Sequence, residues 1–428
     1  MGFSVFNLAG TILEGVRAAG YSTPTDIQRK AIPEALQGND IVGCAPTGTG
    51  KTAAFVLPIL HRLHQTRPSG RSRGRPRALI LAPTRELTQQ IAESVDVYGS
   101  GARCSGVAVY GGVDIGSQIR RLRRGADVVA ATPGRLLDHC CRKTIDLSCV
   151  EILVLDEADR MYDMGFIRDV RKIIRHVPAR RQTLVFSATM PGEIRSLIAE
   201  VQREPRMIQI GAPASPPHAV EQRFYSIAQK RKSPLLEHIL VNEPVSTVLV
   251  FSRTKHGADR IVRRLERKGI STTALHSNRS QSQRRRALDG FKRGTYKVLV
   301  ATDIASRGID VSGISHVINF DTPSFAEDYV HRVGRTGRCD EKGVAITFVA
   351  RDERKHLRRI EGLVGKRCAA AEYPGFDSGI EPEVTEAVET TPLYGTRGKA
   401  GRPSGPARRN PFERRRSSSG RLSRRLAR

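Results

Sequence analysis

The sequence predicts two α/β domains, each built on a parallel sheet, followed by a tail without a packed core. Length is the first reason, because 428 residues are too many for one ordinary hydrophobic core. The second is an alternation of short apolar runs with helical stretches, which occurs in two successive series. The third is a proline-rich segment, residues 211–220, that separates the two series.

The first series predicts a domain over residues 1–210. Its apolar runs are continuous and rich in Val, Ile and Leu, which is typical of strands buried on both faces of a parallel sheet. The predicted strands lie within residues 40–45, 77–83, 106–112, 127–133, 151–159 and 182–189.

The second series predicts another domain, over residues 221–365. The linker before it, residues 211–220, holds three prolines, which cannot continue a helix or a central strand. The predicted strands lie within residues 246–254, 271–277, 296–303, 316–321 and 344–350.

The tail, residues 366–428, is first acidic and then basic. From Gly395 onward it holds twelve Lys or Arg residues against one acid. It has too few apolar residues to offset its ordering entropy, so we expect it to be disordered. It is either a solvated charge run or a salt-sensitive arm for a polyanion.

Composition limits the partners and the compartment. A net charge of +28 favours a polyanionic partner such as nucleic acid or an anionic membrane surface. No apolar run approaches the roughly 20 residues of a membrane-spanning helix, and the start of the chain lacks a signal-peptide pattern. The seven cysteines include no C-x-x-C pair, which indicates a reducing compartment and no structural zinc. We expect a soluble cytoplasmic protein that does not bind membranes.

The segment "APTGTGKT", residues 45–52, predicts a phosphate-binding loop. It joins an apolar strand to a helix, so backbone N–H groups and the helix dipole face a bound anion. Lys51 can reach the β- and γ-phosphates of a nucleotide, and the Thr52 hydroxyl can hold Mg²⁺. Ala45 stands where the general pattern has glycine, so the loop alone leaves the class of nucleotide-binding protein open.

An acidic motif follows another apolar strand, in the segment "ILVLDEADR". This order places the carboxylates of Asp156 and Glu157 at the carboxyl edge of the sheet, where such folds bind ligands. Asp156 suits coordination of Mg²⁺, and Glu157 suits orientation and deprotonation of an attacking water. A solvated acidic turn is the alternative, but a phosphate loop in the same chain favours the catalytic interpretation.

These motifs resemble those of the DEAD-box RNA helicases of superfamily 2, over about residues 3–365. In that family the phosphate loop reads A-x-T-G-x-G-K-T, so Ala45 is expected and Pro46 is the departure. The resemblance implies two tandem RecA-like domains that bind ATP and Mg²⁺. The segment "GYSTPTDIQ" is similar to the family's Q motif, in which the amide of Gln28 would recognise adenine. The implied ATP-site residues are Phe3, Tyr21, Gln28, Thr47, Gly48, Thr49, Gly50, Lys51, Thr52 and Asp310.

Further motifs resemble the family's RNA contacts and its coupling elements. In the first domain these are "PTRELT", the pair Gly111-Gly112, "TPGR" and "SAT"; in the second they are "VFSRT", "QSQR" and "ATDIASRGID". The implied RNA-binding residues are Thr84, Arg85, Gly112, Thr132, Arg135, Arg253, Arg284 and Thr302. The implied coupling residues are Ser187, Thr189 and His331. Out of this context, Thr84 could simply cap a helix whose Glu86 and Glu93 lie on a solvated face.

The segment "HRVGRTGR" places Arg332, Arg335 and Arg338 in one short stretch. Like charges this close usually mark a solvated face, but the segment matches the family's arginine-finger motif. Arg335 and Arg338 would then stabilise transition-state charge from the opposite domain, an effect of about 10³ to 10⁵ in rate. The implied catalytic residues are Lys51, Asp156, Glu157, Arg335 and Arg338, with Thr52 and Asp156 as metal ligands.

The predicted function is RNA-stimulated ATP hydrolysis by a helicase that binds RNA backbone across both domains. It would locally unwind short duplexes or remodel RNA–protein complexes. The basic ending and the segment "DEADRMYDMGFIRDVRKII" most resemble the bacterial RhlE-like branch, which implies ribosome biogenesis, RNA turnover or cold adaptation, with ribosomal or RNA-decay protein partners. Two alternatives stay open: an RNA chaperone that anneals strands through its basic arms, and a DNA-active helicase.

Overall fold

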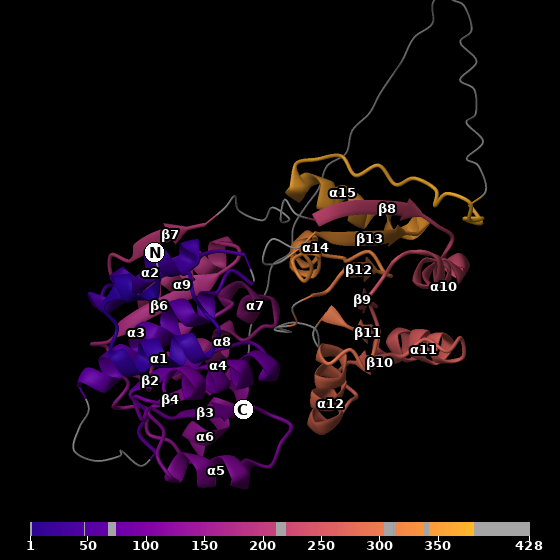
Figure 1. The fold of residues 1–428 in the computed structure, drawn as a ribbon. Coiled ribbons are helices and arrows are strands. Elements are labelled where there is room, and N and C mark those ends of the chain that lie inside the picture. The colour runs from indigo at the N-terminus through magenta and orange to yellow at the C-terminus, as the bar shows by residue number, and fades with distance from the viewer. Residues whose placement is uncertain are drawn as a thin grey trace, which may run out of the picture. The chain divides into compact units, whose positions relative to one another are not determined.

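The computed structural model describes residues 2–46, 48–66, 74–210, 220–303, 311, 313–337 and 342–380. Within them the chain forms two α/β domains, each with a fully parallel sheet (Figure 1), so the predicted fold class is confirmed. Most of the predicted linker and the tail from residue 381 onward lie outside the described residues. Among the described helices, none is long and apolar enough to cross a membrane.

The described part of the first domain holds a seven-stranded sheet in the order β3-β4-β2-β5-β6-β1-β7. Its strands are β1 Ile41–Cys44, β2 Ala78–Leu81, β3 Gly106–Val109, β4 Val128–Ala131, β5 Ile152–Leu155, β6 Gln182–Ser187 and β7 Arg206–Gln209. Its helices are α1 Gly10–Ala18, α2 Asp26–Leu36, α3 Lys51–Gln65, α4 Arg85–Tyr98, α5 Ile115–Arg123, α6 Pro133–Cys141, α7 Ala158–Asp163, α8 Ile167–Ile174 and α9 Gly192–Val201.

Helices cover both faces of this sheet, because alternate residues of each strand enter different cores. In β2, Ala78 and Ile80 belong to one apolar cluster, and Leu79 and Leu81 belong to the other. The continuous apolar runs of the sequence are explained by this burial on two sides. β7 lies at the edge, where Ile208 is its one buried residue.

The second domain repeats the plan with the strand order β10-β11-β9-β12-β13-β8 in its described part. Its strands are β8 Val220–Ser226, β9 Val248–Phe251, β10 Thr272–Leu275, β11 Val298–Ala301, β12 His316–Asn319 and β13 Gly343–Val349. Its helices are α10 Lys232–Asn242, α11 Lys255–Glu266, α12 Gln281–Lys292, α14 Ala326–Val333 and α15 Arg354–Val364, with 3-10 turns at Gln229–Arg231 and Arg351–Glu353.

Strand order decides which motifs meet. In the first sheet β5, β6 and β1 are neighbours, so the loops after them leave side by side at the carboxyl edge. These three loops are the acidic motif, the "SAT" segment and the phosphate loop. In the second sheet β11, β9 and β12 are neighbours, which brings together the loops that carry Asp303, Arg253 and Asp321.

Both predicted boundaries of the second domain need correction. Val220 is the first residue of β8 and not the last residue of the linker. The tail does not begin at residue 366, because residues 366–380 pack on the second domain. Ala371 pairs with β8, donating to Phe224 O at 3.0 Å and accepting from Ser226 N at 2.9 Å. Aromatic residues within this stretch pack against the core of the second domain.

Two rings anchor this segment on α10. Tyr373 and Phe376 both pack against the apolar cluster on that side of the sheet and against the His238 ring. The Tyr373 hydroxyl also donates to Glu243 at 2.9 Å. We call residues 366–380 the C-terminal strap.

Candidate functional site

The phosphate loop is a tight turn that ends at the start of α3. Gly48 and Gly50 both have positive φ, at 83° and 85°, which is unfavourable for other residues. Lys51, the first residue of α3, is buried and donates from Nζ to Ala45 O at 2.8 Å. The loop therefore folds around its own lysine. Thr47 lies outside the described residues.

The Q-motif segment braces this loop. Gln28 is only 1% exposed and donates from Nε2 to Gly50 O at 3.0 Å, while its Oε1 accepts from Thr25 N at 2.9 Å. The Thr25 hydroxyl donates to Thr49 O at 2.8 Å. Both functions of the Gln28 amide are thus directed at the protein, and recognition of adenine by Gln28 stays a prediction.

The two predicted aromatic residues of the ATP site lie together. The ring centroids of Phe3 and Tyr21 are 6.4 Å apart, and both line a cavity of about 400 Å³. Phe3 is buried, whereas Tyr21 is 44% exposed. Tyr21 is therefore the ring that a flat ligand could reach, with Phe3 behind it.

Asp156 is a buried carboxylate at the end of β5, only 2% exposed. Burial raises its pKa to about 7; the charge of Glu157 adds to the rise, and Lys51 opposes it. The backbone N–H of Glu157 donates to Asp156 Oδ1 at 3.0 Å. A buried carboxylate with a raised pKa is stabilised when a cation arrives.

Glu157 is held in a strained backbone conformation with φ 51° and ψ 52°. Burial alone would raise the pKa of its carboxyl, but the charges of Arg160, Arg335 and Lys51 hold that pKa below its ordinary value. Arg160 donates from Nη1 to Glu157 Oε2 at 3.0 Å, and both side chains are buried. Glu157 is therefore ionised at neutral pH, as a general base must be.

The residues present fit a nucleotide-bound Mg²⁺. Among the described residues no group of three or more His, Cys, Asp or Glu side chains could hold a metal ion. Mg²⁺ typically binds one or two protein oxygens together with substrate phosphates and water. Asp156, which lacks a full counter-charge, and the Thr52 hydroxyl match that donor set.

The second domain contributes charge to the same site. His331 on α14 and Arg335 just after it are buried, and both lie within electrostatic range of Glu157. Burial, followed by the charge of Arg160, holds the pKa of His331 well below its usual value, so this ring is neutral. A carboxylate and a lysine of the first domain and an arginine of the second thus act on one another electrostatically. Asp310 and Arg338 lie outside the described residues.

The "DEAD" and "SAT" segments are joined by hydrogen bonds. Asp159 Oδ2 accepts from Ala188 N at 3.1 Å, from Thr189 N at 2.8 Å and from the Thr189 hydroxyl at 2.9 Å. In return, Ser187 Oγ accepts from Asp159 N at 3.1 Å. Ser187 and Thr189 are therefore joined directly to the acidic motif, and their role in coupling stays a prediction.

The predicted RNA contacts of the first domain cluster near the start of α4. Thr84 is buried, and its hydroxyl caps α4 by accepting from Leu87 N at 3.3 Å. The Arg85 guanidinium lies over Gly112, where a Cβ would overlap it and where φ is 80°. Arg85 and Gly112 thus form one surface, and glycine is required there.

The remaining pair of predicted contacts in this domain lies at the start of α6. Thr132 is the N-cap residue of α6 and is partly buried. Arg135 donates from Nη1 to Val113 O at 3.1 Å, which ties α6 to the loop that follows Gly112.

The predicted RNA contacts of the second domain have protein partners. Arg284 is buried and lies 2.9 Å from the carboxylate of Glu86 on α4. The alternative in which Glu86 lies on a solvated face is therefore wrong for this residue. Arg253 is paired with Glu353 at 2.6 Å, and Thr302 is partly buried after β11. RNA binding by these three residues stays a prediction.

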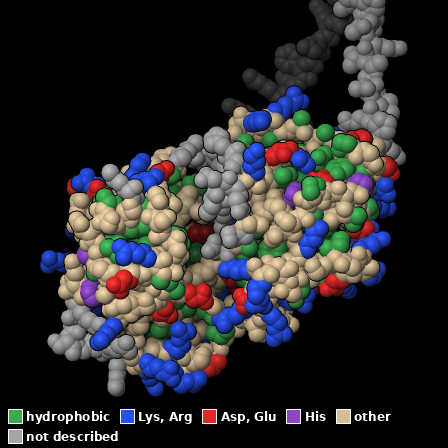
Figure 2. Space-filling view, in the orientation of Figure 1, with side chains coloured by type: hydrophobic (Ala, Val, Ile, Leu, Met, Phe, Trp, Pro, Cys, Tyr) green, Lys and Arg blue, Asp and Glu red, His purple; other side chains and the backbone are tan. Residues whose placement is uncertain are grey.

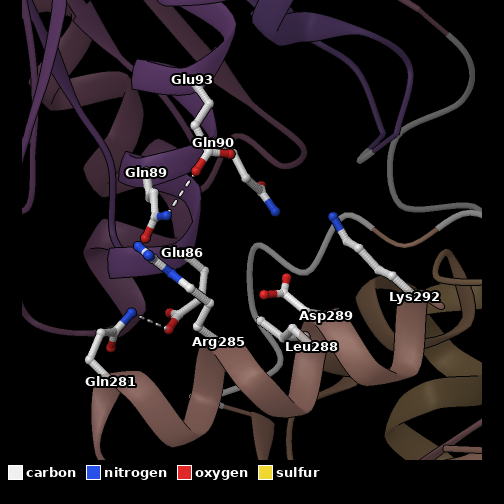
Figure 3. A pocket seen from close by; sticks show the side chains of 9 residues that line it. All are labelled: Glu86, Gln89, Gln90, Glu93, Gln281, Arg285, Leu288, Asp289 and Lys292. Carbon is white, nitrogen blue, oxygen red and sulfur yellow. Dashed lines mark hydrogen bonds between the residues drawn. The ribbon is translucent and has the colours of Figure 1, made fainter. Parts of the chain in front are cut away.

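A polar cavity of about 210 Å³ lies where α4 faces α12. Figure 3 shows Glu86 and Glu93 on α4 opposite Arg285 and Lys292 on α12. Gln281 donates to Glu86 Oε1 at 3.4 Å across the same gap. Opposite charges on the two helices thus favour the approach of the second domain.

Arg332 differs from its neighbours in "HRVGRTGR". Its guanidinium makes two bonds to Asp303, at 2.6 and 2.7 Å, and lies over the Phe251 ring at 4.9 Å. It is buried, so a solvated face is excluded for this residue. Arg332 holds α14 to the sheet, whereas the charge of Arg335 acts on Glu157 in the acidic motif.

Sequence reasoning missed a basic patch on α5. Figure 2 shows Lys and Arg side chains gathered over this helix, on a face that is otherwise a mixture of both charges. The patch consists of the exposed residues Arg120, Arg121, Arg123 and Arg124. The signal was present as "RRLRR" beside Gly112, but a charge run alone usually marks only a solvated face.

Together these features define a class of protein. A phosphate loop and an acid pair lie at one sheet edge, and a second domain of the same plan delivers an arginine, as in ATP-driven helicases of two RecA-like domains. The sequence matches the family model for DEAD/DEAH box helicases over residues 25–197 and the model for the helicase conserved C-terminal domain over residues 231–340.

Relatives and solved structures agree with these matches. The ATP-dependent RNA helicase CshA of Listeria monocytogenes is 43% identical, over 90% of this chain and 73% of the relative. CshA of Bacillus subtilis is 38% identical, over 90% of this chain and 77% of the relative. The structure of S. cerevisiae Dbp5 bound to RNA and ADP BeF3 matches with a TM-score of 0.75 and 28% identity, over 86% of this chain and 95% of that one. The chain belongs to the DEAD-box RNA helicase family.

Proposed function

We propose that this protein is an RNA helicase that grips the backbone of one RNA strand across both domains and uses ATP to separate short duplexes or remodel RNA–protein complexes. One observation supports the proposal most directly: the charge of Arg335 in the second domain helps to lower the pKa of Glu157 in the first, and His331 contributes in the same direction. A catalytic site that needs both domains can be switched by anything that holds the domains together.

ATP hydrolysis is divided between residues of the two domains. Lys51 binds the β- and γ-phosphates, and Glu157, kept ionised by its cationic neighbours, takes a proton from the attacking water. Arg335 stabilises the charge that develops on the γ-phosphoryl group. Mg²⁺, held by Thr52 and Asp156, supplies charge neutralisation at the phosphate oxygens when it is bound.

RNA acts as the second ligand of the closed form. The surface made by Arg85 and Gly112 binds backbone in the first domain, and Arg253 binds it in the second. Because RNA bound to both surfaces favours closure, it raises ATP turnover, and ATP raises RNA affinity by the same coupling free energy. Contacts to phosphate and ribose give little sequence selectivity, while the 2′-hydroxyl separates RNA from DNA.

Steady-state ATP hydrolysis with Mg²⁺ tests the proposal. The purified protein is assayed alone, with single-stranded RNA and with DNA of the same sequence, beside a Lys51→Ala control. We expect strong stimulation by RNA, weak stimulation by DNA and none in the control. Equal stimulation by DNA would instead support a DNA-active helicase, and no stimulation by either would contradict the clamp mechanism.

The finer assignments are also proposals. Thr47, Asp310 and Arg338 complete the ATP site by their match to family motifs. Placement in the bacterial RhlE-like branch rests on the basic ending and the segment after the acidic motif, whereas the relatives described above carry the name CshA. A cytoplasmic role in ribosome biogenesis or RNA turnover, with protein partners from those pathways, follows from that placement. Comparing which RNAs crosslink to the protein in cells would test it.

A further inference from the structure

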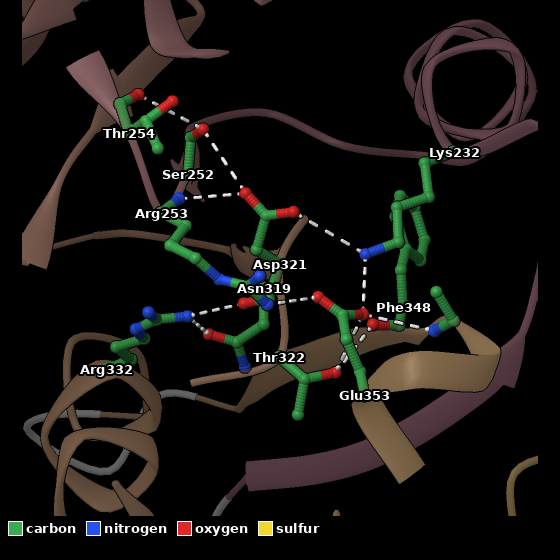
Figure 4. A network of polar contacts seen from close by, with 11 residues as sticks. Lys232, Ser252, Arg253, Thr254, Asn319, Asp321, Thr322, Arg332, Phe348 and Glu353 are labelled. Carbon is green, nitrogen blue, oxygen red and sulfur yellow. Dashed lines mark hydrogen bonds and ion pairs between the residues drawn. The ribbon is translucent and has the colours of Figure 1, made fainter. Parts of the chain in front are cut away.

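A buried ion-pair network in the second domain takes no part in the steps described so far (Figure 4). Lys232, at the start of α10, is 0% exposed; its Nζ lies 2.6 Å from Glu353 Oε2 and 3.5 Å from Asp321 Oδ1. Glu353 ends the 3-10 turn before α15, and Asp321 follows β12. Because buried charges are costly unless paired, these three side chains hold one another in place.

The two carboxylate oxygens of Glu353 have different partners: Oε2 contacts buried donors, and Oε1 contacts Arg253. Oε2 accepts from Lys232 and from Ala350 N at 3.1 Å. These two donors set the orientation of the carboxylate, while the single hydroxyl hydrogen of Thr322 has a closer acceptor in Phe348 O at 2.9 Å. Oε1 then faces Arg253, which donates from Nη2 at 2.6 Å.

Arg253 is held at two points by this network. Its backbone N–H donates to Asp321 Oδ2 at 2.8 Å, and its guanidinium rests on Glu353. Yet 44% of its side chain is exposed, in contrast to the buried Lys232 and Glu353. The network therefore supports a cation that faces solvent from a fixed base.

We propose that Glu353 and Lys232 are positioning residues for RNA binding: Glu353 aims the Arg253 guanidinium at an RNA phosphate, and Lys232 keeps Glu353 in place. This inference rests on the proposed function, in which Arg253 contacts RNA. An arginine already ordered in the free protein loses less side-chain entropy when a phosphate arrives. Neither Glu353 nor Lys232 lies in a motif that the sequence analysis singled out.

The direction in which one substitution changes RNA affinity distinguishes a positioning role of Glu353 from a purely electrostatic one. Glu353→Gln removes a negative charge, so long-range electrostatics alone would tighten binding to a polyanion. Positioning predicts the opposite, because the neutral amide holds Arg253 less strongly. Asp352→Asn removes the same charge at an exposed neighbour and is the matched control.

The test measures binding of labelled single-stranded RNA, and the RNA concentration that half-saturates ATP hydrolysis, for Glu353→Gln, Asp352→Asn, Arg253→Met and the double variant Arg253→Met/Glu353→Gln. We expect Glu353→Gln to weaken both by about tenfold, with a much smaller change in kcat at saturating RNA. Asp352→Asn should bind as the parent does. The double variant should bind no more weakly than Arg253→Met, because Glu353 acts through Arg253.

Two results would overturn the inference. If Glu353→Gln binds RNA as tightly as the parent or more tightly, Glu353 competes with RNA for Arg253 or has no role. If the loss of RNA affinity caused by Glu353→Gln adds in full to the loss caused by Arg253→Met, Glu353 acts through the general stability of the domain. Should Glu353→Gln lack a cooperative thermal transition, Glu353→Asp replaces it under the same two criteria. Absence of RNA stimulation in the parent would overturn the proposed function itself, which is a different result.

Discussion

The two sheets carry acidic residues at the same edge but compensate them differently. In the first domain Asp156 accepts a backbone N–H, and burial raises its pKa to about 7. In the second domain Asp303 is paired bidentately with Arg332, and Glu353 is paired with Lys232 and Arg253. The difference shows which edge awaits a ligand. The raised pKa of Asp156 marks a carboxylate that would be stabilised by a cation, although Glu157 beside it is already paired with Arg160. The paired carboxylates of the second domain form a frame that positions other groups.

The largest effect is expected when Arg335, the arginine that the second domain contributes to the ATP site, is replaced. Arg335→Ala should lower RNA-stimulated kcat by about 10³ to 10⁵, because transition-state charge loses its partner. ATP hydrolysis at saturating RNA measures it, and Arg168→Ala, an exposed arginine on α8, is the control. If the Arg335→Ala variant keeps the parental kcat, the second domain does not contribute this charge to ATP hydrolysis in the first.

The next largest effect is expected for substitution of Glu157, the ionised carboxylate of the acidic motif. Glu157→Gln keeps the shape of the side chain but removes the base, and kcat should fall by about 10² to 10⁴. ATP binding, followed by equilibrium titration, should be retained. The exposed Glu14→Gln serves as control. Hydrolysis at the parental rate would exclude Glu157 as the base.

A stability measurement tests the paired edge. Lys232→Met leaves Asp321 and Glu353 as buried acids without their shared cation, which should cost about 3 to 5 kcal/mol in the free energy of unfolding. Urea denaturation of the second domain reports the loss, and Lys230→Met, an exposed lysine two residues earlier, should have no measurable effect. Equal stability of the two variants would contradict the assignment of this edge as a frame.

The smallest expected effect is an increase in the free energy of unfolding, caused by a substitution of Asp156. Because the folded pKa of Asp156 is raised, the folded protein holds that proton when the unfolded chain has released it, so stability is lost as pH rises from about 4 to about 7. Asp156→Asn should therefore stabilise the protein without nucleotide and Mg²⁺ by about 1 to 3 kcal/mol at about pH 8, and by little at about pH 5. Denaturation at both pH values checks this. Destabilisation at the higher pH would mean that Asp156 is already compensated.

Local patterns predicted the strands that precede the motif loops but missed β7 and β8, which are only partly buried. The continuous apolar runs before Asp156 and Arg253 identified buried strands because burial on both faces imposes that composition. The motifs also predicted that the loops carrying Lys51 and Glu157 leave the same edge of the sheet, since each loop follows a strand directly. Strand order could not be predicted, because the pairing of β1 with β6 depends on residues far apart in the chain.

The ion pairs that neutralise the buried carboxylates could not be predicted from the sequence either. Glu353 reaches Lys232 and Arg253 across 121 and 100 residues, and no local pattern signals such distant partners. Glu86 looks like a solvated helix residue until α12 lies opposite it. Tyr373 and Phe376 lie in a stretch without the apolar pattern of a helix or strand, so the sequence did not indicate that their rings pack on the second domain.

The C-terminal strap has a practical consequence for truncation. β8 is the last strand of its sheet, and Ala371 pairs with it where solvent would otherwise reach the backbone. A chain cut after residue 365 would expose that strand and invite pairing between molecules. It would also uncover the apolar surface beneath Tyr373 and Phe376. Aggregation of such a chain could then be mistaken for loss of RNA annealing by the basic arm, whereas a cut after Ile380 would keep the edge covered.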